Sequence, residues 1–162
     1  PDDARGWDVL APIYLRLGRF NEAASAFANA IRLDEPTAAR LSGQGEALTA
    51  AANGRVTDEA QALFSQALNI EPGNIRGRYF TGLASAQTGD RQAAESVWRA
   101  MLTDLPEDSP WHGVVAQAMN EMAEPSGVND QAQMIEGMVT SLAMRLEANH
   151  DDVDGWQQLI RA

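Results

Sequence analysis

Three stretches of the 162-residue chain can be written under one another, and this internal repeat restricts the fold more than any other feature. Aromatic residues correspond at steps of 37 and then 34 positions: Phe27, Phe64 and Trp98. Small and aliphatic residues recur in the same register: Ala23, Ala60 and Ala94, then Ile31, Leu68 and Leu102. Each repeated unit must therefore be one supersecondary structure that buries its apolar face against its neighbours.

A period of about 34 residues with small residues at fixed points and a closing proline is typical of the tetratricopeptide repeat, or TPR. In that fold each unit is a pair of antiparallel helices. Gly45 and Gly82 stand where the two helices of a pair should cross closely, and Ala11 takes that place in the first unit. Gly18 and Gly89 fall between the paired helices, where a positive φ costs glycine little.

The second unit differs from the other two between its helices. It carries three extra residues in TAAANGRVTDEA, residues 49–60, which predicts a longer turn there. Pro72 and Pro106 should end the second helices of their units, because proline cannot continue a helix.

The period breaks after the third unit. Ser109 and Pro110 suit the start of a helix, and apolar residues then recur on one face as far as Met122. A second copy of the opening motif PDDARGW follows much later as HDDVDGW. We therefore predict an all-α TPR solenoid made of three repeats at 4–37, 38–74 and 75–108, a capping helix at 109–123, a linker at 124–129, a long helix at 130–148, and the first helix of a fourth repeat at 152–162.

The charge balance limits the partners that this chain can bind. Its formal net charge is −11, which argues against nucleic acid and against anionic membrane surfaces, and which would favour basic partners. No apolar run approaches the roughly 18 residues of a spanning helix. Since the chain begins at Pro1 and ends within an amphipathic pattern, we interpret it as a piece of a longer protein, and the lack of a signal or anchor in it says nothing about that protein.

Catalytic and metal-binding patterns are weak. The chain has no cysteine, and its two histidines, His112 and His150, have no helical partner at the spacing of a zinc site. The acidic motif HDDVDG places His150 and Arg161 where a calcium loop needs acids. Acids such as Asp3 and Asp152 are better explained as caps of a first helical turn. We therefore expect no enzyme activity, no metal and no cofactor.

A binding groove is the remaining candidate for a functional site. In a TPR stack the first helix of each pair lines the concave face. The register places these residues there: Asp8, Pro12, Leu15, Arg16, Glu46, Thr49, Arg76, Tyr79, Phe80, Leu83 and Gln87. The predicted groove is mostly apolar or small, with one aromatic pair and few charges, and it suits the hydrophobic face of an amphipathic helix or an extended peptide. The clamp with which other TPR domains hold a C-terminal carboxylate is not present, because Asp8 and Pro12 occupy two of its positions. Alternatively, Tyr79, Phe80 and Leu83 pack on the chain's own insertion helix.

Longer segments carry a more specific resemblance. They are RGWDVLAPIYLRLGRFNEAASAFANAIRL, GEALTAAANGRVTDEAQALFSQAL and RYFTGLASAQTGDRQAAESVWRAML, together with the tail MIEGMVTSLAMRLEANHDDVDGWQQLIRA. With these segments the chain resembles the C-terminal periplasmic TPR region of the cytochrome c-type biogenesis family known as CycH or CcmI. The tail adds to the resemblance because a long helix leading into a second tryptophan motif is unusual for TPR proteins in general.

The resemblance implies a function. Proteins of that family are anchored in the inner membrane by an N-terminal segment, and their TPR region faces the periplasm. The region holds apocytochrome c, chiefly by its C-terminal helix, and presents it to the haem-ligation machinery without performing covalent chemistry. We therefore expect a protein-binding domain whose partners are apocytochrome c and the haem-ligation proteins. The alternative is a general TPR scaffold that joins the subunits of a protein assembly.

Overall fold

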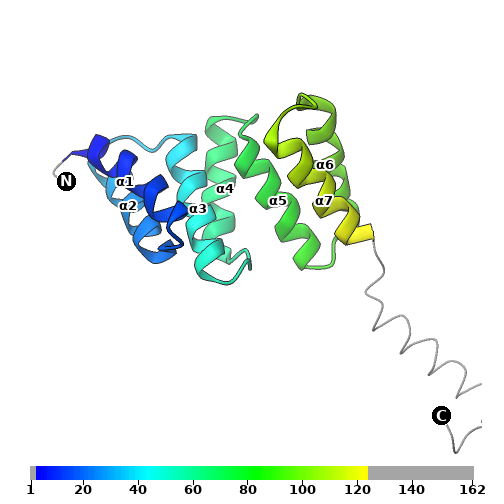
Figure 1. Ribbon diagram of the computed structural model, residues 1–162, viewed down its shortest axis with the longest axis horizontal. Coiled ribbons are helices and arrows are strands. Elements are labelled where there is room, and N and C mark those ends of the chain that lie inside the picture. The colour runs from blue at the N-terminus through cyan, green and yellow to red at the C-terminus, as the bar shows by residue number, and fades with distance from the viewer. Residues whose placement is uncertain (1–2, 124–162) are drawn as a thin grey trace, which may run out of the picture. The chain divides into compact units, whose positions relative to one another are not determined.

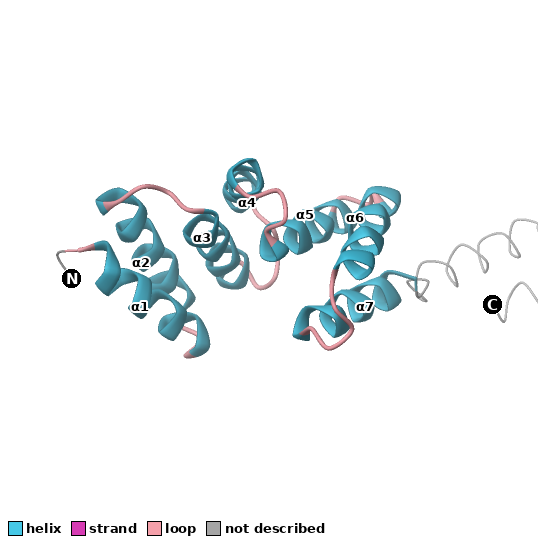
Figure 2. Cartoon of the chain, turned by 90° about the horizontal axis from the view of Figure 1, so that it is seen from above, coloured by secondary structure: helices cyan, strands magenta, loops and turns pink. Residues whose placement is uncertain are grey.

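The computed structural model describes residues 3–123, which form helices joined by short turns (Figures 1 and 2). No strand occurs in this part of the chain. The helices follow one another in chain order as α1 (Ala4–Arg16), α2 (Phe20–Leu33), α3 (Ala38–Ala51), α4 (Asp58–Ile70), α5 (Ile75–Gln87), α6 (Arg91–Asp104) and α7 (Pro110–Ala123). The predicted all-α TPR fold is confirmed.

The helices pack as consecutive pairs. The pairs α1–α2, α3–α4 and α5–α6 lie within the stretches 4–37, 38–74 and 75–108, and each second helix also contacts the first helix of the next pair. The first helices contact one another as well, α1 with α3 and α3 with α5. They therefore share one face of the stack, which is the arrangement that a groove requires. The predicted linker 124–129, long helix 130–148 and fourth-repeat helix 152–162 lie outside the described residues.

Polar side chains begin most of these helices. Five of them have an N-cap side chain that accepts a hydrogen bond from the backbone N–H three residues later: Asp3, Thr37, Thr57, Asn74 and Asp90. Each cap satisfies one of the donors that a first helical turn leaves free. The capping role expected of Asp3 is confirmed, with its carboxylate 2.8 Å from the Gly6 nitrogen.

The turns between paired helices follow the glycine pattern. Gly18 and Gly89 have φ values of 71° and 85°, in the left-handed region that glycine enters without strain. The longer turn between α3 and α4 holds two such residues, Asn53 at 55° and Gly54 at 85°. The predicted longer turn is therefore present, and it uses the residue types that tolerate this backbone conformation.

A large aromatic residue lies where the helices of each pair cross. A Cβ atom added to Gly45 would lie 2.6 Å from the Phe64 ring, so no side chain fits between them. At Gly82 the Trp98 ring takes this position, and its indole N–H donates to the Tyr79 carbonyl over 3.1 Å. The neighbouring alanines are fully buried: Ala23, Ala60 and Ala94. Small residues are therefore required at these crossings.

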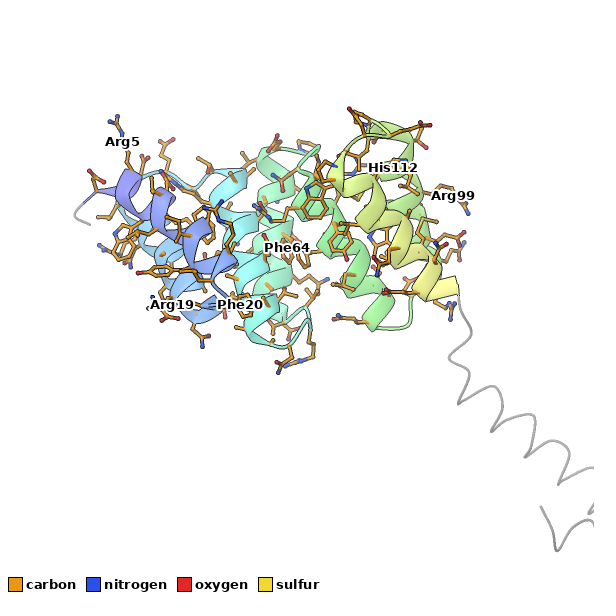
Figure 3. The ribbon with its side chains drawn as sticks, viewed as in Figure 1. Arg5, Arg19, Phe20, Phe64, Arg99 and His112 are labelled. Atoms are coloured by element: carbon orange, nitrogen blue, oxygen red, sulfur yellow. The ribbon has the colours of Figure 1, made fainter. Side chains whose placement is uncertain are left out.

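The same aromatic residues also join one pair to the next. Phe27 lies against the backbone of α3 at Gly43. Phe64 stacks on Phe80 of α5, with ring centroids 4.9 Å apart and planes inclined by 4°. Figure 3 places Phe64 among the side chains inside the stack, while Arg99 extends from its edge. Each ring thus packs at the helix crossing within its own pair and also contacts the first helix of the following pair.

Helix α7 covers the third pair. The Ser109 hydroxyl accepts a hydrogen bond from the Trp111 nitrogen over 3.3 Å at the helix start. Val115 of α7 is fully buried and belongs to one apolar cluster with Trp98 and Met101 of α6. At the other end of α7, the Arg91 guanidinium donates to the Met122 carbonyl. This helix therefore occupies the place at which a further first helix would pack.

The glycine at the α3–α4 crossing provides a test of this packing. We expect Gly45→Ala to lower the free energy of unfolding by about 1–3 kcal/mol, because the added methyl group displaces the Phe64 ring. Gly113→Ala is the matched control, since Gly113 lies in α7 with no neighbour near its Cβ position. The free energy of unfolding of this control should rise by about 0.5–1 kcal/mol, because alanine has a higher helix propensity than glycine. Urea unfolding of both variants measures the two effects, and equal changes would contradict the proposed crowding.

Candidate peptide-binding groove

Two adjoining hollows lie on the face formed by the first helices. Their volumes are about 330 and about 300 Å³, and they share Pro12, Leu15 and Arg76. The larger is lined in addition by Asp8, Phe27, Thr37, Ala39 and Arg40. The smaller is lined in addition by Arg16, Phe20 and Glu46. Residues of α1, α3 and α5 therefore meet around one continuous depression.

Pro12 lies in the interior of α1, exposed between the two hollows. It has no backbone N–H, so the Asp8 carbonyl lacks the partner that a regular helix would supply. A proline at such a position destabilises the helix, whereas an alanine at the same position would not. Its ring and the half-buried Leu15 side chain give the hollows an apolar wall from α1.

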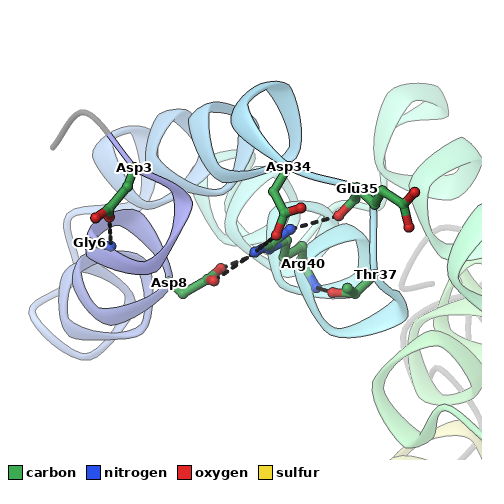
Figure 4. Close-up of polar contacts among 7 residues, drawn as sticks. All are labelled: Asp3, Gly6, Asp8, Asp34, Glu35, Thr37 and Arg40. Atoms are coloured by element: carbon green, nitrogen blue, oxygen red, sulfur yellow. Dashed lines mark hydrogen bonds and ion pairs between the residues drawn. The ribbon is translucent and has the colours of Figure 1, made fainter.

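Arg40 closes the larger hollow with a set of hydrogen bonds (Figure 4). Its Nε and Nη2 atoms donate to the two carboxylate oxygens of Asp8, over 2.9 and 2.8 Å. Nη2 also donates to Asp34 over 3.0 Å, and Nη1 donates to the Glu35 carbonyl over 2.6 Å. The guanidinium thus joins α1, the α2–α3 connection and α3 into one unit.

This cluster also fixes its own charge state. The hydrogen bond from Arg40 holds the pKa of the Asp8 carboxyl below its ordinary value, and the same interaction raises the pKa of Arg40. The Arg40 side chain is 10% exposed and that of Asp8 37%, so the pair is only partly shielded from water. Asp8 was predicted as a groove residue; it lines the larger hollow, but its carboxylate is already occupied by Arg40.

Glu46 and Arg76 form a second ion pair at the smaller hollow. The Glu46 Oε2 and Arg76 Nε atoms lie 2.5 Å apart, and both side chains are about one-third exposed. These two atoms are buried and make no hydrogen bond of normal geometry. The contact is therefore an ion pair in which the Arg76 Nε–H group and the Glu46 Oε2 atom make no regular hydrogen bond.

Other predicted groove residues are engaged with the protein itself: Thr49 is buried, and Tyr79, Phe80 and Leu83 are half-buried. Thr49 is 2% exposed and its hydroxyl donates to the Gly45 carbonyl over 2.9 Å. Tyr79 and Leu83 pack against the cluster that contains Trp98 and Val115, and the Tyr79 ring lies 5.4 Å from that of Trp111 on α7. Burial raises the pKa of the Tyr79 hydroxyl. Phe80 is the residue that stacks on Phe64, so the expected aromatic pair does not line the hollows.

Gln87 connects the third pair to the second. Its amide accepts from the Val56 nitrogen over 2.9 Å and donates to the Gly54 carbonyl over 2.8 Å. The end of α5 thereby holds the long α3–α4 turn by two hydrogen bonds. Gln87 was predicted to face a ligand, and in the structure its amide contacts this turn.

Six of the eleven predicted groove residues line the hollows: Asp8, Pro12, Leu15, Arg16, Glu46 and Arg76. Thr49, Tyr79, Phe80, Leu83 and Gln87 do not. The repeat register did not reveal Arg40, Thr37 or Phe20. Arg40 lies 32 residues from Asp8 in sequence, and no local pattern links the two.

Metal-ligating clusters and membrane-spanning helices are both absent from residues 3–123. No group of three or more histidine, cysteine or acidic side chains there could hold a metal ion. No helix in the same range is long and apolar enough to cross a membrane.

Comparison with known proteins agrees with this architecture. A family model described as the cytochrome c-type biogenesis protein H TPR domain matches residues 1–112. The chain belongs to this family. The matched range covers α1 to α6 and the start of α7, so the groove lies entirely within it.

Two CycH proteins are similar to this chain along its whole length. The cytochrome c-type biogenesis protein CycH of Bradyrhizobium diazoefficiens is 38% identical over 177 aligned positions, which cover 100% of this chain and 48% of the relative. CycH of Rhizobium meliloti is also 38% identical, with the same coverage. CcmH of Escherichia coli is 30% identical over 76% of this chain and 36% of its own length. The chain therefore spans about half the length of the CycH relatives that it matches throughout.

The Arg40 cluster predicts a stability effect. Arg40→Gln should lower the free energy of unfolding by about 2 kcal/mol near neutral pH, because Asp8 and Asp34 lose their shared partner while staying partly hydrated. Arg32→Gln is a suitable control, since Arg32 contributes only one exposed hydrogen bond, to Asn29. Chemical unfolding of both variants measures the difference, and an equal loss would contradict a special role for Arg40.

The same cluster predicts a pH dependence. The pKa of Asp8 is lowered from 3.8 in the folded protein, so its contribution is fully present above that value and is lost as the pH falls through the lower folded value. Unfolding curves recorded between pH 7 and pH 2 should therefore show the stability of the wild-type protein approaching that of Arg40→Gln below about pH 4. A constant difference down to pH 2 would argue against this linkage.

The two hydrogen bonds of Gln87 predict a change in local hydrogen exchange and not in global stability. Gln87→Ala should speed hydrogen exchange at the Val56 amide, because that N–H loses its acceptor. Gln92→Ala, on the exposed surface of α6, is the matched control. Hydrogen exchange followed by NMR would compare the two, and unchanged exchange at Val56 in Gln87→Ala would show that the turn is held by other contacts.

Proposed function

We propose that this domain acts in cytochrome c maturation by holding apocytochrome c, through its C-terminal helix, in the groove between α1, α3 and α5. The client would then be passed to the proteins that ligate haem. We also propose that the domain works in the periplasm, as part of a protein held at the inner membrane by a segment outside these 162 residues. Membership in the biogenesis family supports the pathway, and the groove supports the binding role.

The observation that carries this proposal is the pair of adjoining hollows with an apolar wall. A helix bound in a groove is recognised by side chains spaced along one face, which enter depressions in sequence. The two hollows share Pro12 and Leu15, so adjacent side chains of one ligand helix can fill both. The Arg40 cluster and the crossings at Gly45 and Gly82 fix the helices around them, which limits the conformational entropy lost on binding.

A general scaffold that joins protein subunits remains the second candidate. It is favoured by the packing of Tyr79 and Leu83 against the cluster that contains Val115 of α7, because this packing covers part of two large side chains that were predicted to face the ligand. The two functions differ in the ligand: a scaffold binds folded subunits, whereas a maturation factor must bind a helix of an unfolded apocytochrome.

Peptide binding to the full chain tests the proposal. A synthetic peptide of the C-terminal helix of a bacterial apocytochrome c should bind, as measured by calorimetry, and Pro12→Glu should weaken binding at least tenfold. The exposed position tolerates this substitution, while the added carboxylate enters both hollows without any gain for an apolar ligand face.

Gln66→Glu is the control for that experiment. It adds the same charge on an exposed position of α4, away from the first helices, and should leave the affinity unchanged. Absence of binding by the wild-type chain would overturn the maturation role. Binding that Pro12→Glu and Gln66→Glu reduce equally would place the ligand outside this groove.

A further inference from the structure

Charge is divided unevenly between the first and second helices of the pairs. Helices α1, α3 and α5 contain five arginines and two acids, whereas α2, α4 and α6 contain three arginines and five acids. The charged residues that line the two hollows are three arginines, Arg16, Arg40 and Arg76, and two acids, Asp8 and Glu46, although the chain as a whole has a formal net charge of −11. Arg40 is paired with Asp8 and Asp34, and Arg76 with Glu46, so Arg16 is the lining arginine without an acidic partner among the described residues.

Two arginines of this wall have unused hydrogen-bond donors. Within residues 3–123, neither Arg16 nor Arg76 donates a hydrogen bond, although Arg76 forms its ion contact with Glu46. Arg40, in contrast, makes four hydrogen bonds and has little capacity left for a ligand. Arg16 and Arg76 line the same hollow of about 300 Å³, so the two side chains border one space.

The rest of that hollow is apolar. Pro12 and Leu15 of α1 and Phe20 at the start of α2 line it beside the two guanidinium groups. Guanidinium groups bind carboxylates by paired, charge-assisted hydrogen bonds. A ligand that fits this lining has a carboxylate directly attached to a unit with an apolar side chain. The last residue of a polypeptide has this chemistry.

We propose that the hollow binds the free α-carboxylate at the C-terminus of the partner polypeptide, with Arg16 and Arg76 as its hydrogen-bond donors. This inference rests on the proposed function and adds an orientation to it. The end of a helix carries the negative pole of its dipole as well as the α-carboxylate, so both favour the same place. The ligand helix therefore lies with its C-terminal end between Arg16 of α1 and Arg76 of α5.

Glu46 has a defined part in this site. Its carboxylate holds Arg76 by the ion contact and repels a second carboxylate that enters the same hollow. Neutralising it should strengthen carboxylate binding, while removing either arginine should weaken it. Asp8 and Pro12 replace two donors of the clamp found in other TPR domains, so the site described here depends on a different donor set.

A small probe tests the site independently of any client protein. N-acetylleucine, added at millimolar concentration to the 162-residue chain, should shift the NMR signals of the Arg16 and Arg76 side-chain N–H groups. N-acetylleucinamide, which lacks the carboxylate, should shift them much less. Equal shifts with both compounds, or shifts with neither, would overturn the proposal whatever the result with apocytochrome peptides.

Peptides then test the orientation. The apocytochrome helix peptide with a free C-terminus should bind about tenfold more tightly than the same peptide with a C-terminal amide, the difference expected for loss of a charge-assisted hydrogen bond. Arg16→Gln and Arg76→Gln should each abolish this preference, and Glu46→Gln should increase the affinity of the free acid several-fold.

Arg99→Gln, on the exposed face of α6, is the control and should keep the full preference. Equal binding of acid and amide would overturn the carboxylate site while leaving the proposed function intact. An acid preference that persists in both Arg16→Gln and Arg76→Gln would place carboxylate recognition elsewhere. Arg16 is exposed, so its variant should fold even if Arg76→Gln loses stability.

Discussion

The close approach of paired helices at a residue without a side chain is the contact on which the rest of this structure depends. At Gly45 and Gly82 an aromatic ring takes the space that a Cβ atom would need. Because the same ring also meets the following pair, as Phe64 meets Phe80, one contact sets both the angle within a hairpin and the spacing between hairpins. The relative positions of α1, α3 and α5, and hence the groove, follow from it.

The repeat register made much of this architecture predictable. Corresponding residues such as Ala23 and Ala60, and the turn glycines Gly18 and Gly89, carry local information that each unit expresses in the same way. The groove was less predictable, because exposure on a shared face does not say what else reaches that face. Tyr79 was assigned to the ligand surface by register, yet it packs on Trp98 and Trp111. Contacts such as Arg40 with Asp8 join distant positions and have no periodic signal.

Electrostatics in the groove differ from what the net charge implies. The acids that dominate the composition are concentrated on the second helices, the turns and the residues outside the described range, while arginines gather on the first helices. Two of these arginines, Arg40 and Arg76, are partnered by acids of the groove wall. The first pair is fully hydrogen-bonded and serves stability, whereas the second retains donors. Overall charge therefore describes solubility better than it describes this binding surface.

The two hydrogen bonds of Gln87 have a consequence for how repeats of unequal length can share one stack. An inserted stretch normally adds conformational freedom to the unfolded chain that folding must remove. Here the amide of the next pair holds the backbone of the longer turn at Gly54 and Val56. The length of the α3–α4 turn and the identity of residue 87 are thus coupled. A homologue with a three-residue turn at this place has no need of an amide there, and the two features should change together.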